Sequence, residues 1–64
     1  MKAAELRKLI GKEIEWEESY CQWRGGIIRQ GIVKEVTGRN VLVDQFGTNN
    51  WEWLPDMKKI KERE

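Results

Sequence analysis

The chain has 64 residues and a formal net charge of +1, from 12 Lys and Arg against 11 Asp and Glu. This length allows one domain with a small core, and the near-zero charge does not by itself indicate a nucleic-acid-binding protein. Because there is no histidine and Cys21 is the single cysteine, the sequence excludes histidine-based catalysis, a histidine metal site and an intramolecular disulfide. We therefore expect a non-enzymatic domain without a cofactor or metal. We also expect it to be cytoplasmic, since it lacks an apolar leader and a membrane-length apolar run.

The N-terminal segment has the pattern of a short helix. Residues 2–10 are good helix formers, and Leu6, Leu9 and Ile10 follow the i, i+3, i+4 spacing of one helix face. Gly11 then supplies a common helix stop. Because so short a helix is marginal alone, it must pack on the rest of the domain, and we expect it to cover one open end of the sheet that follows.

Residues 13–17 change to the two-residue period of a β-strand. Acidic and apolar residues alternate there, which predicts a half-buried strand with Ile14 and Trp16 facing inward. The acidic residues of this segment would then form one negatively charged edge of the domain, comprising Glu13, Glu15, Glu17 and Glu18.

The middle of the chain predicts a loop, a long strand and a tight turn. Residues 19–26 have no clear period and end in two glycines, as loops do. Residues 27–36 are rich in β-branched side chains, and Gly31 within them indicates a bulge or sharp bend. Residues 37–40 form a turn between two β-rich runs, which predicts a hairpin.

The last third of the chain predicts two further strands and a final short one. A strand begins at residues 41–43, and residues 47–50 form a second cluster of turn residues. Residues 51–54 predict a short strand that ends at proline, residues 55–57 one helical turn, and residues 58–61 the last strand. No repeats or linkers interrupt this order.

Five short strands with closely spaced turns predict a mainly β fold. We expect a closed five-stranded barrel, because closure protects the edges of so small a sheet. The predicted organisation is a single domain, residues 1–64, with a short N-terminal α-helix over residues 2–10 and the barrel over residues 12–61.

Two segments of the chain resemble known small barrels. Gly31, Val33 and Val36, followed after a turn by Val41 and Val43, resemble the Gly-x-Val pattern of KOW modules. Residues 41–47, the tryptophan-rich strand and residues 54–57 are similar to the second half of Tudor-like domains. The resemblance covers most of residues 12–61 and implies an SH3-like barrel. It also implies binding, since KOW modules contact RNA or transcription and translation proteins, and Tudor-like domains hold peptides, often at an aromatic cage.

The aromatic side chains are the main candidates for ligand contact. In Tudor-like barrels the first long loop, here with Tyr20 and Trp23, meets the turn that Phe46 and Trp51 flank. Such rings hold a cation or stack on a base, but rings also fill thin cores. Trp51 and Trp53 share one face of their strand, and Leu54 lies on the other face. If Leu54 points inward, both tryptophans therefore point outward. Both orientations remain open from the sequence.

Basic residues interleave with these rings, as contact with phosphate and bases requires. The alternative is that they only keep a small protein soluble.

We predict a small regulatory or accessory binding module that contacts RNA or DNA. The main alternative is a protein-interaction adaptor for a peptide or partner subunit, and a third possibility is a homo-oligomer. The candidate ligand-binding residues are Tyr20, Trp23, Arg24, Arg29, Arg39, Phe46, Trp51 and Trp53, with Lys34 as a further basic neighbour.

Overall fold

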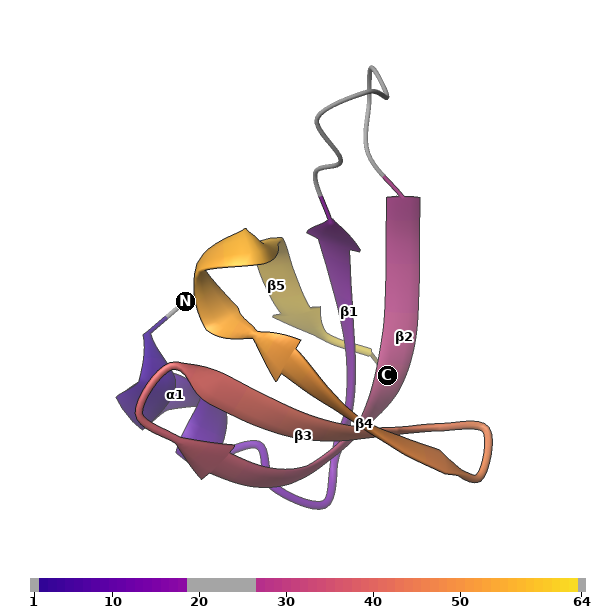
Figure 1. Ribbon diagram of the computed structural model, residues 1–64, viewed down its shortest axis with the longest axis horizontal. Helices are drawn as coiled ribbons and strands as arrows, with labels where there is room; N and C mark the ends of the chain where they lie inside the picture. The colour runs from indigo at the N-terminus through magenta and orange to yellow at the C-terminus, as the bar shows by residue number, and fades with distance from the viewer. Residues whose placement is uncertain (1, 19–26, 64) are drawn as a thin grey trace.

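A computed structural model describes residues 2–18 and 27–63, which form one antiparallel sheet with a short helix before it (Figure 1). The strands follow the order β4-β3-β2-β1-β5. The prediction of a mainly β fold with five strands and a short N-terminal helix is confirmed, and the sheet is compatible with an SH3-like barrel. The elements are α1 (Ala3–Arg7), β1 (Glu13–Glu18), β2 (Ile27–Thr37), β3 (Asn40–Gln45), β4 (Thr48–Trp53), the 3-10 turn η1 (Leu54–Asp56) and β5 (Met57–Glu62).

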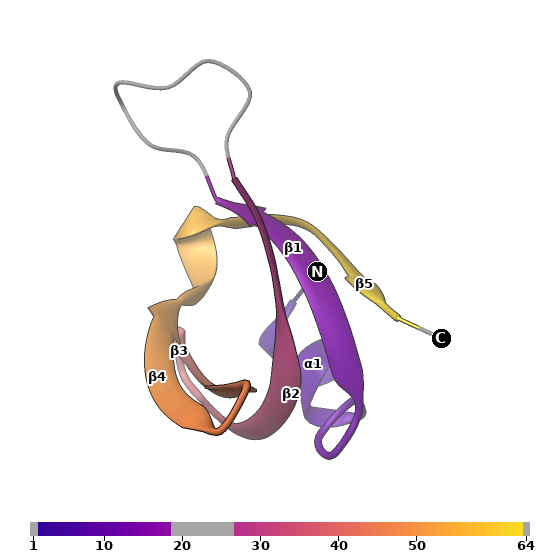
Figure 2. The same cartoon turned by 90° about the vertical axis from the view of Figure 1, so that its right-hand side faces the viewer.

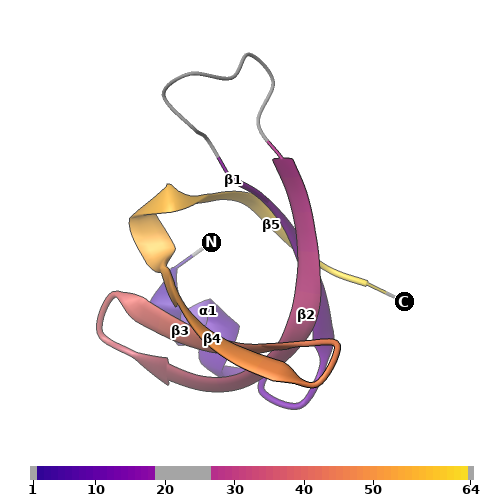
Figure 3. The same cartoon turned by 45° about the vertical axis from the view of Figure 1, so that its right-hand side comes forward.

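The long strand β2 belongs to both halves of the sheet. Its first part pairs with β1 and its second part with β3, and it curves so that β3 and β4 run across the direction of β1 and β5 (Figures 2 and 3). Gly31 lies where the halves approach each other. A Cβ atom at this position would lie 2.2 Å from Cγ1 of Val43 and 2.9 Å from the carbonyl oxygen of Asp44. Only glycine leaves room for this curvature.

Of the two alternatives predicted for Gly31, a bulge or a sharp bend, the bulge lies further along β2. Pairing between β1 and β2 is regular through Gly31, which lies opposite Ile14. The register shifts instead between Val33 and Glu35, where β2 pairs with β3. Glycine is therefore needed at position 31 because β2 and β3 pack closely there, and not because the strand pairing is irregular.

The inner face of the curved sheet, together with one residue of α1, makes the core. Of the described aromatic side chains, only that of Trp16 is fully buried, so aliphatic residues supply most of the core. The alternative in which Trp51, Trp53 and Phe46 fill the core is wrong for all three. The buried cluster comprises Leu6, Ile14, Trp16, Val33, Val36, Val41, Val43, Met57 and Ile60.

The helix is shorter than the sequence predicts. After α1 the chain continues in tight turns, in which the Leu9 N–H donates to the Leu6 carbonyl at 2.9 Å. Leu6 is buried and Leu9 packs on the core as predicted, but Ile10 turns away and is 48% exposed. The cause is the junction with the sheet: Gly11 adopts a φ of +89° and donates its N–H to Val33 at 2.7 Å. A longer helix would carry this donor away from β2.

The second hairpin turn lies earlier than predicted. Phe46 and Gly47 both have positive φ, 55° and 90°, which is the signature of a two-residue primed turn. The carboxylate of Asp44 accepts the Gly47 N–H at 2.8 Å and stabilises this conformation. Strand β4 therefore begins at Thr48, and the polar residues 48–50 that we assigned to a turn belong to the strand.

Candidate binding surface

The outer face of β3 and β4 exposes two indole rings. Val41 lies opposite Glu52 and Leu42 lies opposite Trp51 in the β3–β4 ladder. Since paired residues share a face and Val41 is fully buried, Glu52 lies on the inner face, and Trp51 and Trp53 lie on the outer face. The two side chains are 53% and 45% exposed. We call this surface the tryptophan face; it comprises Leu42, Trp51 and Trp53.

The orientation left open by the sequence is thus the outward one. Leu54 packs against the core, as the outward orientation requires. Helix α1 does not cover the two rings, since both remain about half exposed in this structure. Two large apolar side chains on one short strand therefore face solvent.

Two cations lie near the tryptophan face. Arg39 is exposed in the β2–β3 turn, and its carbonyl accepts the Leu54 N–H at 2.7 Å, which holds the turn against the end of β4 beside Trp53. Lys34 is exposed at the register shift of β2, next to Glu35, which lies opposite Leu42. Within the part of the chain that the structure describes, neither cation forms an ion pair.

Arg29 lies on the other side of the sheet. It is opposite the buried Trp16 in the β1–β2 ladder, and its Nε lies 3.2 Å from Oε2 of Glu18. Its charge is therefore engaged with an acidic side chain of the inner face. Of the four basic residues that the sequence placed among the aromatic rings, Arg29 does not join the tryptophan face.

A pair of carboxyl groups connects β1 and β4 on the inner face. Glu18 is buried and accepts a hydrogen bond from Nε1 of Trp16 at 3.2 Å. Glu52 hydrogen-bonds to Glu18, and its pKa is raised to about 7, first by desolvation and then by the hydrogen bond and negative charge of Glu18. Arg29 opposes this shift. The pair therefore takes up or releases a proton near neutral pH.

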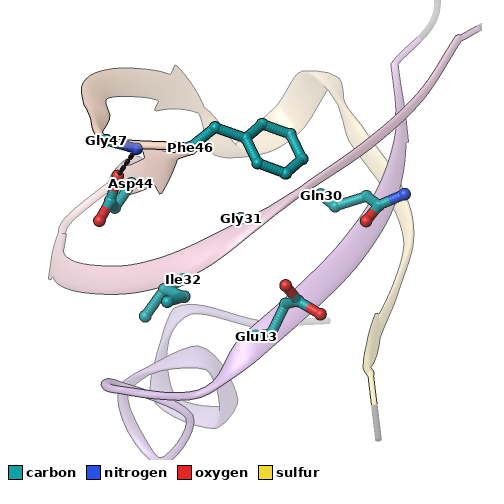
Figure 4. A pocket seen from close by; sticks show the side chains of 7 residues that line it. All are labelled: Glu13, Gln30, Gly31, Ile32, Asp44, Phe46 and Gly47. Atoms are coloured by element: carbon teal, nitrogen blue, oxygen red, sulfur yellow. Dashed lines mark hydrogen bonds between the residues drawn. The ribbon is translucent and has the colours of Figure 1, made fainter.

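Phe46 lies at the opposite end of β4 from Trp53, on the tip of the β3–β4 hairpin. Its ring is 93% exposed and borders a cleft of about 210 Å³ between this tip and strands β1 and β2 (Figure 4). Arg63 lies near the cleft, where it contacts Glu13 at 3.7 Å and hydrogen-bonds to Gln30. The cleft is lined by Glu13, Gln30, Gly31, Ile32, Asp44, Phe46 and Gly47.

The structure thus brings together only part of the predicted site. Trp51, Trp53 and Arg39 lie near one another, whereas Arg29 is on the inner face and Phe46 is at the far hairpin tip. The remaining candidates, Tyr20, Trp23 and Arg24, lie outside the described residues, so their meeting with this surface stays a prediction.

Sequence reasoning missed three residues of this region. For Leu42 the signal is the alternation of Val41, Leu42 and Val43, which predicts that Leu42 points outward. Glu52 sits between two outward tryptophans and must therefore face inward. No local pattern indicates that Glu18, a distant residue in the chain, is its partner.

No family model, curated protein or solved structure matches the chain. Among the described residues, no cluster of His, Cys, Asp or Glu has the geometry to hold a metal ion. No helix in residues 2–18 or 27–63 is long and apolar enough to span a bilayer.

Proposed function

We propose that the chain is a non-catalytic, cytoplasmic binding module of the SH3-like barrel type and that the tryptophan face is its contact surface. The observation that carries this proposal is the pair of half-exposed indole rings on one face of an ordered strand. Scattered exposed apolar residues are common, but large apolar side chains grouped on one face mark interaction sites. The sheet order and the strong curvature of β2 support the SH3-like class.

Single-stranded nucleic acid is the first ligand class that we propose. Residues i and i+2 of a strand are about 7 Å apart, so Trp51 and Trp53 offer two neighbouring ring surfaces on which bases can stack. Arg39 lies at the end of β4 beside Trp53, and Lys34 is exposed on β2 next to the partner of Leu42, so both can supply cations for phosphate groups. Exposed rings beside basic side chains form the usual combination in single-strand recognition.

Titration of the protein with single-stranded RNA and DNA oligonucleotides tests this assignment. Binding should quench tryptophan fluorescence, and Trp51→Ala and Trp53→Ala should each weaken affinity by about tenfold through the loss of one stacked base. Arg39→Ala should reduce the dependence of log affinity on log salt concentration by about one unit. Arg7→Ala, a change of an exposed cation on α1, is the matched control and should have little effect. Unchanged affinity in both tryptophan variants would reject nucleic acid as the ligand of this face.

A protein or peptide partner is the second candidate. It is favoured by the apolar side chain of Leu42 beside Trp51, which extends the exposed apolar area onto β3, and by the resemblance to Tudor-like domains. Binding of this kind depends on burial of apolar area and changes little with salt. A partner whose affinity falls in the two tryptophan variants but not in 0.5 M salt would therefore replace nucleic acid in the proposal.

A further inference from the structure

The two edges of the sheet differ in their protection against a further strand. The edge strand β5 carries exposed lysines at positions 58, 59 and 61. Lys59 has a φ of 52°, and the β1–β5 register shifts between Glu15 and Glu17. Lysines and bulges on an edge strand are the usual means by which proteins prevent edge-to-edge pairing.

The other edge strand, β4, has none of these features. It contains no Lys, Arg or Pro, and it pairs with β3 over Thr48–Trp53 without a register shift. Its single ionisable residue, Glu52, points to the inner face. Among the described residues, no strand pairs with its second side. Thus β4 presents a regular, uncharged edge.

The hairpin turn determines which residues of β4 face this free edge. In a hairpin with a two-residue turn, the pair that closes the turn is hydrogen-bonded, and hydrogen-bonded pairs then recur at every second residue. The closing pair is Gln45 with Thr48. The N–H and C=O groups of Asn49, Trp51 and Trp53 are therefore directed to the free edge, while their side chains lie on the outer face.

We propose that two copies of this chain pair antiparallel through β4, about a two-fold axis at Trp51. In this register Trp51 lies opposite Trp51 of the second copy, and Asn49 lies opposite Trp53 of the second copy. Every outward-directed N–H and C=O of the three residues finds a partner, which makes about six main-chain hydrogen bonds. The contact is isologous, as in most dimers.

Neighbouring registers are less favourable. If the pairing of the two β4 strands shifted by one residue, an inner-face residue of one copy would lie opposite an outer-face residue of the other, so the two sheets would not join with matching faces. Moving the axis to Glu52 would set the two Glu52 side chains opposite each other and leave only two of the three edge-directed residues paired. In the central register Glu52 lies opposite Asn50 of the second copy, an uncharged amide.

The dimer joins the outer faces of two sheets. Both tryptophan faces then lie on one continuous surface, with the Trp51 rings next to each other at the axis. This inference does not depend on the ligand class proposed above, because it follows from the main-chain groups and charges of β4.

Sedimentation velocity over a range of protein concentrations, without any ligand, tests the dimer. Wild type should sediment as a dimer at high concentration, and Trp51→Lys, which sets two cations opposite each other, should raise the dissociation constant at least tenfold. Leu42→Lys is the matched control, since it adds the same charge to the same face one strand away from the edge, and should remain dimeric. Asn49→Pro removes an edge-directed N–H while keeping the ladder to β3, so it tests the edge even if Trp51→Lys does not fold.

Disulfide trapping tests the register. In a Cys21→Ser background, Trp51→Cys brings two Cα atoms about 5.5 Å apart across the axis, within the range of a disulfide. Trp53→Cys places its two copies about 14 Å apart, so it should not cross-link to itself. A wild-type protein that stays monomeric at 0.5 mM, or equal cross-linking of the two variants, would overturn the proposal. Neither result bears on nucleic-acid binding, which the titration measures separately.

Discussion

The two halves of the sheet both contribute apolar residues to one core but differ on their outer faces. Across β1 and β5, exposed lysines pair with partly buried acids, with Lys61 Nζ 3.3 Å from Glu15 and Lys59 Nζ 3.6 Å from Glu17. Across β3 and β4, the outer face carries the partly buried Leu42 and the exposed Trp51 instead. Exposed ion pairs contribute about 0–1 kcal/mol each, so the charged half does not owe its fold to them. The inner faces therefore supply the core, whereas the outer faces of the two halves differ in charge and in apolar character.

The largest expected effect comes from the residue at which the two halves meet. Gly31→Ala places a methyl group 2.2 Å from Val43 and 2.9 Å from the backbone of Asp44, so the strands must separate. We expect a loss of about 3 kcal/mol in the free energy of unfolding, measured by urea denaturation.

Gly11→Ala is the matched control for this change. Gly11 has a φ of +89°, and no atom lies within 4 Å of a Cβ added there, so only backbone strain opposes alanine. The expected loss is about 1 kcal/mol. A loss in Gly31→Ala no larger than that in Gly11→Ala would show that the strands accommodate the methyl group and that their close approach does not require glycine at position 31.

The carboxyl pair that connects the halves predicts a dependence of stability on pH. The pKa of Glu52 is raised from 4.5 to about 7 in the folded state, so between these values the folded state holds a proton that the unfolded state has lost. Stability therefore falls as pH rises from 4.5 to 7 and stays low above pH 7. Because Glu52 is partly exposed, solvent screening reduces the effect, and Glu52→Gln should stabilise the protein by about 1 kcal/mol at pH 8 and by little at pH 4.5.

Glu35→Gln is the control for the carboxyl pair. Glu35 lies on the outer face opposite Leu42, away from Glu18 and Glu52. Thermal unfolding of both variants from pH 4 to pH 8 measures the difference. If Glu35→Gln removed the pH dependence as fully as Glu52→Gln, the pair on the inner face would not be its source.

The smallest expected effect concerns the charged half. Lys61→Ala removes the ion pair with Glu15 and should cost about 0.5 kcal/mol at low salt, falling towards zero in 1 M salt. Lys34→Ala removes an exposed lysine from the other half and should change stability by less. A loss at Lys61 that persists in 1 M salt would mean that its aliphatic stem packs on β1.

Much of this fold follows from local patterns in the sequence. The alternation in residues 13–17 predicts β1 with Ile14 and Trp16 inward, and both are fully buried. The turn at residues 37–40 and the short helical turn around Pro55 are also confirmed. These elements can be predicted because the conformational preferences of residues that are neighbours in the sequence agree with the observed structure.

The structure differs from the sequence-based prediction where contacts between distant residues determine the conformation. The turn at Phe46 has an unusual residue for a left-handed conformation, so turn propensity placed it later, among asparagines. Likewise, a pattern of basic residues does not show that Arg29 faces Glu18, because this pairing depends on how β1 and β2 are aligned. The site was predicted in part for the same reason: parity places Trp51 and Trp53 on one face, but only burial of Val41 shows which face it is.

The turn at Phe46 also has a consequence for protein engineering. Its backbone is left-handed and its ring lies almost wholly in water, so neither conformational preference nor burial favours phenylalanine there. Asparagine accepts this backbone geometry more readily and would sacrifice no buried contact. A thermostable version of this domain can therefore begin at the hairpin tip, at the opposite end of β4 from Trp53.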